Sequence, residues 1–432
     1  MKALAATPPM GWNSWDCYGT TVTEAEVIAN AEFLHRRLLP AGWDTVVIDA
    51  GWFDPYARAH GYNEPLQPVL DSWGRLVPVV GRFPSAADGA GFGPLAARVH
   101  ELGLRFGIHV MRGIPRLAVE KDLPVFGTEY TAREIADVDS VCPWNRDNFG
   151  LDVTHPGAQA YYDAQVRQFA RWGVDFIKLD DMLAPFHGEE IRMYARAIAA
   201  SGRPISLSLS PGTHLSTRHL EPLRESAQLW RISDDLWDRW EDVHAQFARL
   251  ARWAPLQASG AWADADMLPL GRIGLRAERG EPRDSLLTWE EQRTVLTLWA
   301  MARSPLMVGG DLPTSDERTI ELLANPWLAR VLGATRDNGE IIREPHGDGE
   351  WIVWAARSSS ADGEHFVAAF WTGTGHADIR VPISSIVGHQ DGGSWNARDL
   401  WSDDDEAPVE GELSASVPEH GVRWFALRRA DA

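Results

Sequence analysis

The stretch TEAEVIANAEFLHRRLLPAGWDTVVID, residues 23–49, contains the unit from which the fold is built. Thr23 and Glu26 have the spacing of a capping box, which predicts that a helix begins here. Apolar residues then recur at helical spacing until Gly42 ends the helix. The run 46–48 is short, apolar and β-branched, as expected of a strand that is buried on both faces. The sequence therefore predicts a helix followed by a buried strand.

The same unit returns along the first two-thirds of the chain, which predicts one strand per repeat. The predicted strands lie at residues 10–15, 46–48, 106–108, 174–179, 205–210, 229–233, 261–268 and 305–308. Helices that alternate with such strands indicate an α/β fold, either a (β/α)8 TIM barrel or an open doubly wound sheet. The barrel is favoured because the number of units is right and no Gly-rich dinucleotide fingerprint follows any strand.

After about Leu332 the helical pattern stops and short strand-like runs follow, separated by Gly, Asp and Ser turns. These runs are 350–356, 366–371, 377–381, 394–401 and 422–427, with no helix expected between them. They predict a small C-terminal antiparallel β-sandwich domain. The chain is thus divided into a catalytic (β/α)8 barrel at 1–330 and a sandwich domain at 331–432, with a linker expected within 325–336.

The composition excludes several classes of partner. The formal net charge is −20, and such a surface repels the phosphate backbone of nucleic acids. The sequence contains no run of about 18 apolar residues and no apolar stretch typical of a signal peptide, so we expect no membrane partner. Cys17 and Cys142 are too few for a disulfide framework. We therefore expect a cytoplasmic protein, and the oligomeric state stays open, a homo-oligomer included.

Acidic residues gather at the C-terminal ends of the predicted strands, where barrel enzymes build their sites. They are Asp49, Asp180, Asp181, Asp234, Asp235, Asp264 and Asp266. A single aspartate at such a position often only caps the next helix, but capping does not explain four strand ends. A ring of carboxylates suits either a metal site or the two-carboxyl hydrolysis of a glycosidic bond. His109 is the one strand-end histidine found, so glycoside hydrolysis is favoured and no metal is expected.

Four motifs resemble those of glycoside hydrolase family 27, the α-galactosidase (melibiase) family. They are TPPMGWNSW at 7–15, WGVDFIKLD at 172–180, RISDD at 231–235 and WADADML at 262–268. Several long motifs in the right order are far more specific than a single match. The resemblance spans the barrel and continues into the sandwich. It implies a retaining exo-glycoside hydrolase that cleaves terminal α-galactose-type residues by double displacement, with no cofactor and with a small oligosaccharide or glycoside as substrate.

The resemblance also assigns roles to the matching residues. Asp180 would be the nucleophile, and Asp235 the general acid and base. The residues expected to bind the sugar are Trp15, which would stack on its apolar face, Asp49, Lys178, Arg231, which would lie on the nucleophile side, and His109, where the family commonly has Tyr. The residues expected to support the site are Asp181, Asp234, Asp264, Asp266 and, within an insertion at 111–148, Trp144.

Three departures from the family motifs bear on the substrate. Ala50 follows Asp49 where the family has a second aspartate, which suits a pentose such as L-arabinopyranose because this sugar lacks the hydroxymethyl group of galactose. The nucleophile is followed by Asp181, and the loop 207–212 lacks the family's Cys-x-Trp-Pro pattern, which could leave room for an N-acetyl group. The alternatives are therefore a β-L-arabinopyranosidase, an α-N-acetylgalactosaminidase, a non-catalytic carbohydrate-binding homologue and a metal-dependent barrel hydrolase.

Overall fold

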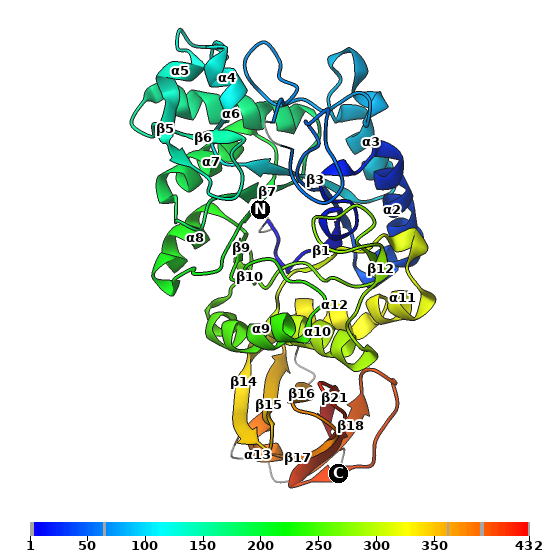
Figure 1. The fold of residues 1–432 in the computed structure, drawn as a ribbon. Coiled ribbons are helices and arrows are strands. Elements are labelled where there is room, and N and C mark those ends of the chain that lie inside the picture. Colours follow the sequence, from blue (N-terminus) through cyan, green and yellow to red (C-terminus); the bar gives the residue numbers. More distant parts are fainter. Residues whose placement is uncertain (1–3, 64–65, 361–362, 389–392, 431–432) are drawn as a thin grey trace.

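The computed structural model describes residues 4–63, 66–360, 363–388 and 393–430. Figure 1 shows a large body of helices and strands with a smaller domain of strands below it, which contains the C-terminus. In the described part of the chain, no helix combines the length and the apolar character needed to cross a membrane.

The larger body is built on a curled sheet of parallel strands. Over the described residues the sheet has eight strands in the order β10-β9-β8-β7-β3-β2-β1-β13. The bounds are β1 Met10–Asn13, β2 Thr45–Ile48, β3 Arg105–Met111, β7 Phe176–Asp180, β8 Ser206–Leu209, β9 Leu229–Arg231, β10 Trp262–Asp264 and β13 Leu306–Val308. Leu268, just after β10, pairs in parallel with Val308 of β13, which closes the sheet. The predicted (β/α)8 barrel is therefore confirmed, and the open sheet is excluded.

The helices surround this barrel (Figure 1). The larger ones are α2 Glu24–Arg37, α3 Gly93–Glu101, α6 Pro156–Arg171, α7 Gly188–Ser201, α8 Leu220–Ser226, α9 Trp240–Trp253, α10 Trp289–Ala302, α11 Glu317–Leu323 and α12 Pro326–Ala334. The predicted capping box begins α2, since the N–H of Thr23 donates to Glu26 Oε2 at 2.9 Å and the N–H of Glu26 donates to Thr23 Oγ1 at 3.4 Å.

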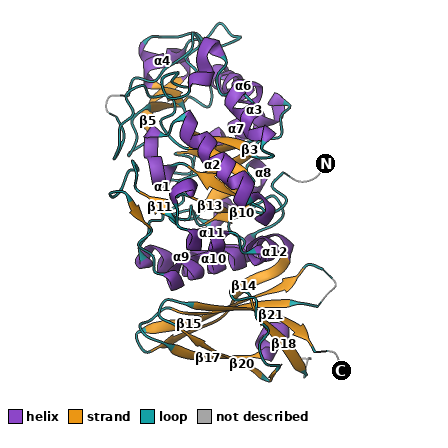
Figure 2. Ribbon diagram, turned by 90° about the vertical axis from the view of Figure 1, so that its right-hand side faces the viewer, coloured by secondary structure: helices purple, strands orange, loops and turns teal. Residues whose placement is uncertain are grey.

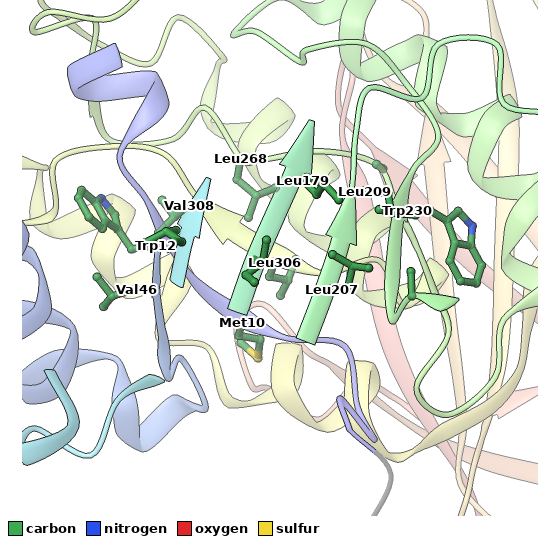
Figure 3. Packing of buried hydrophobic residues seen from close by; sticks show 14 of the residues in the cluster. Met10, Trp12, Val46, Leu179, Leu207, Leu209, Trp230, Leu268, Leu306 and Val308 are labelled. Atoms are coloured by element: carbon green, nitrogen blue, oxygen red, sulfur yellow. The ribbon is translucent and has the colours of Figure 1, made fainter. Parts of the chain in front are cut away.

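Apolar side chains fill the inside of the barrel. Figure 3 shows Leu179 and Leu207 on the neighbouring strands β7 and β8, together with Leu306 of β13, and all three side chains are buried. Because such a core leaves no room for substrate, a site in this fold lies at the mouth, beyond the C-terminal ends of the strands.

Two irregular segments extend from the strand ends at the mouth of the barrel. After β3 the chain forms a three-stranded sheet of β4 Ile114–Pro115, β5 Ala136–Val141 and β6 Asn148–Leu151, with the short helices α4 Arg116–Glu120 and α5 Ala132–Ile135. After β10 it forms a hairpin of β11 Arg272–Ile273 and β12 Arg283–Asp284. Strands β3 and β10 lie four places apart in the eight-stranded order, so these segments rise from opposite sides of the barrel.

The C-terminal domain is the predicted β-sandwich. One layer contains β14 Thr335–His346, β15 Gly349–Ser358, β16 His365–Trp371, β21 Val422–Arg429, β18 Ser394–Asp399 and β19 Val409–Glu410, and the other contains β17 Ala377–Pro382 and β20 Glu412–Val417. Figure 2 shows this domain beneath α9, α10 and α12. It is held to the barrel by hydrogen bonds such as Trp401 Nε1–H to Thr297 Oγ1 at 3.0 Å.

Two details of the sequence interpretation are wrong. The short helix α13 Ile383–Val387 lies among the strands where no helix was expected; Ile383, Ile386 and Val387 pack into the sandwich core, so tertiary burial outweighs their β propensity. The expected linker 325–336 is largely the helix α12, because Asn325 caps it and Leu328 is buried against the barrel.

Candidate active site

The mouth of the barrel contains a pocket of about 400 Å³ at the C-terminal ends of the strands. Most of the residues singled out in the sequence line it: Trp15, Asp49, Trp144, Lys178, Asp180, Arg231, Asp234 and Asp235. Those that lie buried behind the lining are His109, Asp181, Asp264 and Asp266. A larger hollow of about 800 Å³ lies between α12 and the sandwich, far from the strand ends. We therefore assign the chemistry to the pocket at the mouth.

Asp180 is the last residue of β7, and its carboxylate is surrounded by donors. Oδ1 accepts a hydrogen bond from Ser210 Oγ at 2.8 Å and from the N–H of Asp181 at 2.9 Å, while His109 Nε2 lies 3.4 Å from Oδ2. Burial raises the pKa of Asp180, but the hydrogen bond and charge of His109, with Lys178 and Ser210, outweigh it and hold this pKa well below its usual range. An ionised carboxylate in this position is suited to nucleophilic attack.

Lys178 and Asp49 form an ion pair on the pocket wall. Lys178 Nζ lies 2.8 Å from Asp49 Oδ2, and Asn13 Nδ2 donates to the same oxygen at 2.8 Å. Burial raises the pKa of Asp49, but the charge of Lys178 outweighs it, so the pKa is lowered. Both groups are therefore charged, and the ammonium group, which has three donors, keeps hydrogens for sugar hydroxyls.

Arg231 ends β9 and binds two carboxylates. Its Nη1 lies 2.6 Å from Asp266 Oδ1, and its Nη2 lies 3.2 Å from Asp235 Oδ1. Both contacts lie on the β9–β10 side of the mouth, because β9 adjoins β10, whose loop contains Asp266. Arg231 also lines the same pocket as Asp180, and its contacts orient Asp235.

Asp235 follows β9 and faces the outer part of the pocket. Its side chain is 36% exposed, against 15% for Asp180. Its backbone N–H donates to Asp234 Oδ1 at 3.0 Å, and Asp234 is itself exposed at the rim. Asp235 therefore has the access to solvent that a group exchanging protons with a leaving group and with water requires.

Asp181 is turned away from the pocket. Its φ is +62°, and its Oδ2 accepts a hydrogen bond from Arg112 Nε at 2.9 Å. The same guanidinium donates through Nη1 to Glu190 Oε1 at 2.7 Å and to Ser140 Oγ at 3.0 Å. Burial raises the pKa of Asp181 to about 6. Asp181 thus joins the nucleophile strand to the insertion and to α7.

Asp264 and Asp266 brace the loop behind Asp235. Asp264 Oδ1 accepts the N–H of Asp266 at 2.9 Å. Asp266 Oδ2 accepts the N–H of Leu236 at 2.7 Å, while its other oxygen binds Arg231. These two aspartates hold the strand end and the Asp235 loop in register.

An apolar cluster adjoins the pocket at Trp15. Trp15 in the short helix α1 Trp15–Tyr18 packs against Tyr62, with ring centroids 5.7 Å apart, and both side chains line the pocket. Ala50 is 2% exposed and lies in the same cluster, together with Met307, but it is not among the lining residues. Where the family motif has a second carboxylate, this chain therefore has a buried methyl group.

The sequence interpretation missed part of the lining: Tyr62, Ser210, Thr213, His214, Glu278 and Arg279. All of them lie in loops that follow barrel strands. Ser210 is the last residue of the predicted strand 205–210, and that strand-end position was the available signal. Tyr62 and Glu278 lie in long loops without periodicity, and the sequence offers no comparable signal for them.

A parallel barrel with two carboxyl groups and sugar-binding donors at its mouth defines a glycosidase. The chain is 44% identical to the β-L-arabinopyranosidase of family 27 from Geobacillus stearothermophilus, solved with arabinose, with a TM-score of 0.94 over 99% of this chain and 98% of that one. Residues 147–332 match the family model "Alpha galactosidase A", and residues 348–427 match "Alpha galactosidase C-terminal beta sandwich domain". The chain belongs to glycoside hydrolase family 27, the α-galactosidase family.

Two further relatives have other specificities in their names. A putative α-N-acetylgalactosaminidase from Bacillus halodurans is 38% identical, with a TM-score of 0.88 and full coverage of both chains. The α-galactosidase of Cyamopsis tetragonoloba is 28% identical over 99% of this chain and 87% of its own length. This scaffold is therefore used for more than one galactose-like sugar, and the pocket must distinguish them.

Proposed function

We propose that this enzyme is a retaining exo-glycosidase that releases terminal β-L-arabinopyranosyl residues. The observation that carries the proposal is Ala50, a buried methyl group that packs with Trp15 of the pocket wall where the family motif has a second aspartate. L-arabinopyranose has the ring of galactose without the hydroxymethyl group. Without that aspartate, the hydroxymethyl group of a galactoside lacks a carboxylate acceptor, and a hydrogen bond to a charged group contributes about 1.5–3 kcal/mol. The 44% identical arabinopyranosidase supports the same sugar.

In the proposed mechanism, Asp180 attacks the anomeric carbon while Asp235 protonates the departing glycosidic oxygen. Asp235 then removes a proton from water, which attacks the glycosyl-enzyme and releases the sugar with its original anomeric configuration. The donors around Asp180 keep it ionised for the first step, and Arg231 orients Asp235 for both steps. Lys178 and Asp49 bind ring hydroxyls, and Trp15 packs against the apolar face of the sugar.

An α-galactosidase is the second candidate. The Asp49–Lys178 pair and Trp15 are proposed to bind the ring hydroxyls and the apolar face, which galactose and L-arabinopyranose share, and not the hydroxymethyl group. The same pocket would accept galactose with a lower kcat/KM. The α-N-acetylgalactosaminidase alternative depends on the loop after β8, where Ser210 is bound to the nucleophile and Thr213 and His214 line the wall.

We further propose that the catalytic barrel at 1–330 and the sandwich at 331–432 meet within the helix α12, which joins them, and that the sandwich supports the barrel. We also propose that the enzyme acts in the cytoplasm and that its substrates are small glycosides.

The test is hydrolysis of four nitrophenyl glycosides: β-L-arabinopyranoside, α-galactoside, α-N-acetylgalactosaminide and α-glucoside. We expect the arabinopyranoside to have the highest kcat/KM, about tenfold or more above the galactoside. Proton NMR of the first-formed sugar should show the anomeric configuration of the substrate. A preference for galactoside would reverse the assignment of the sugar, an inverted product would refute the double displacement, and activity lost to a chelator and restored by zinc would favour a metal-dependent hydrolase.

A further inference from the structure

Asp181, which directly follows the proposed nucleophile, has an unusual backbone conformation. Its φ is +62°, in the left-handed region that disfavours residues with a Cβ atom, although aspartate and asparagine tolerate it better than most. In this conformation the backbone N–H of Asp181 donates to Asp180 Oδ1 at 2.9 Å. The hydrogen bonding of the nucleophile therefore depends on the backbone torsions of the next residue.

Arg112 holds both peptide groups beside the Cα atom of Asp181. Its backbone N–H donates to the carbonyl oxygen of Asp180 at 3.0 Å, and its Nε–H donates to the carbonyl oxygen of Asp181 at 3.1 Å. The same Nε–H donates to Asp181 Oδ2 at 2.9 Å, so the side chain and the backbone of Asp181 share one donor. Because the two flanking peptide planes set the torsions of a residue, these contacts hold Asp181 in its left-handed conformation.

The guanidinium of Arg112 is itself held in place. Its Nη1 donates to Glu190 Oε1 at 2.7 Å and to Ser140 Oγ at 3.0 Å, and the Tyr162 hydroxyl donates to Glu190 Oε2 at 2.5 Å. The side chains of Arg112, Asp181 and Glu190 are at most 5% exposed. Breaking such a buried set of charges is costly, because a carboxylate would be left unpaired. These three residues are not among those that line the pocket, so the network acts from behind it.

The network makes the two oxygens of Asp180 unequal. Oδ1 accepts the N–H of Asp181 at 2.9 Å and the Ser210 hydroxyl at 2.8 Å. Within the described part of the chain, Oδ2 has one longer contact, at 3.4 Å from His109 Nε2. Oδ2 thus keeps lone pairs for the anomeric carbon, while the donors on Oδ1 stabilise the carboxylate that departs in the second step.

We propose that Asp181 and Arg112 are positioning residues for the nucleophile. Arg112 holds Asp181 in its left-handed conformation, and the N–H of Asp181 then fixes Oδ1 of Asp180, so that Oδ2 is the oxygen that attacks. Neither residue touches the substrate. The inference rests on the proposed function, because it takes Asp180 as the nucleophile, and it does not depend on which sugar is cleaved.

The first test compares Asp181→Asn with Asp181→Ala. Both remove the same charge, but asparagine keeps an oxygen for Arg112 and tolerates a positive φ, whereas alanine does neither. The assay uses whichever of the four nitrophenyl glycosides wild type hydrolyses fastest. We expect Asp181→Ala to lower kcat about tenfold or more, as for the loss of a hydrogen bond to a charged group. Asp181→Asn should keep most of kcat, and Asp181→Gly, which adopts a positive φ freely, should fall between them. The inhibition constant of the released sugar should stay near the wild-type value in all three.

The second test removes the group that is positioned. In the Asp180→Ala background, azide supplies the nucleophile, so adding Asp181→Ala should change the azide-dependent turnover by less than about twofold. Tyr162→Phe is the matched control, since it removes a hydrogen bond from the same buried network without touching Asp181. It should lower Tm and leave kcat unchanged.

Four results would each overturn the positioning role. They are an unchanged kcat in Asp181→Ala, equal losses in the asparagine and alanine variants or in the glycine and alanine variants, an equal loss in Tyr162→Phe, and a loss that persists in the Asp180→Ala background. Azide that fails to restore turnover to Asp180→Ala would instead refute Asp180 as the nucleophile, and with it the proposed function. A preference for the galactoside would change the sugar and leave this test as it stands.

Discussion

Ala50→Asp tests the assignment of the sugar directly. The substitution restores a carboxylate at the end of β2, inside the apolar cluster of Trp15 and Tyr62. In a galactoside the hydroxymethyl group can donate a hydrogen bond to this carboxylate, and a hydrogen bond to a charged group contributes about 1.5–3 kcal/mol. That free energy corresponds to a rise of about 10- to 150-fold in kcat/KM for the galactoside. An arabinopyranoside has no such hydroxyl, so for this substrate the buried charge beside Asp49 only costs free energy.

The assay is the ratio of kcat/KM for nitrophenyl α-galactoside to that for nitrophenyl β-L-arabinopyranoside. A ratio cancels any loss of correctly folded enzyme, which matters because Ala50 is 2% exposed. Ala50→Val serves as the apolar control and should not raise the ratio. A change of less than about twofold in this ratio would be smaller than the effect of the weakest hydrogen bond considered above. Such a result would show that the residue at position 50 does not select the sugar.

Three further predictions concern the charges of the site. Asp180→Ala should lower kcat more than about a thousandfold, and added azide should restore turnover as a glycosyl azide of inverted configuration; restoration without a nucleophile would remove Asp180 from its role. Ser210→Ala removes a hydrogen bond to the Asp180 carboxylate, which raises the pKa of Asp180, so the acid limb of the kcat/KM profile should move to higher pH; an unmoved limb would refute this contact. Asp49→Asn leaves Lys178 buried without its ion-pair partner and should lower Tm at pH 7. Because the pKa of Asp49 is lowered in the fold, its contribution to the free energy of unfolding is present above the unfolded pKa of about 3.9 and is lost as the pH falls below it. The difference in Tm between variant and wild type should therefore shrink toward pH 2. A deficit that stays constant from pH 7 to pH 2 would show that the ion pair is not its origin.

The sequence predicts the barrel well because its strands are short apolar runs between helical patterns that end at glycine. Positions at strand ends follow from the same pattern, which predicts the places of Asp49 and Asp180 on the pocket, whereas Lys178 was expected there only from the family resemblance. Partners are harder to predict. Arg231 contacts Asp235 and Asp266, and this pairing depends on which strand lies beside β9, a property that the motif does not contain.

The rest of the fold and site escaped prediction for two physical reasons. The strand β14 Thr335–His346 is polar, and half of its residues are exposed without regular alternation, so it lacks the pattern that marks a half-buried strand. Tyr62, Glu278 and Arg279 lie in long loops whose shape depends on distant contacts, such as the Arg283–Asp238 ion pair. Local sequence carries the signal for periodic elements, whereas these loops are positioned by tertiary structure.

The three departures from the family motifs differ in what they do to the site. Asp181 points into the buried Arg112 network, so its carboxylate supports the nucleophile strand and is not among the residues that line the pocket. The loop after β8 contributes Ser210, which binds Asp180 and thus acts on the nucleophile. Ala50 is a buried methyl group at the end of β2, beside Trp15 of the pocket wall, and the proposed choice of L-arabinopyranose depends on it. Under this proposal, a change of sugar requires no change in Asp180 or Asp235.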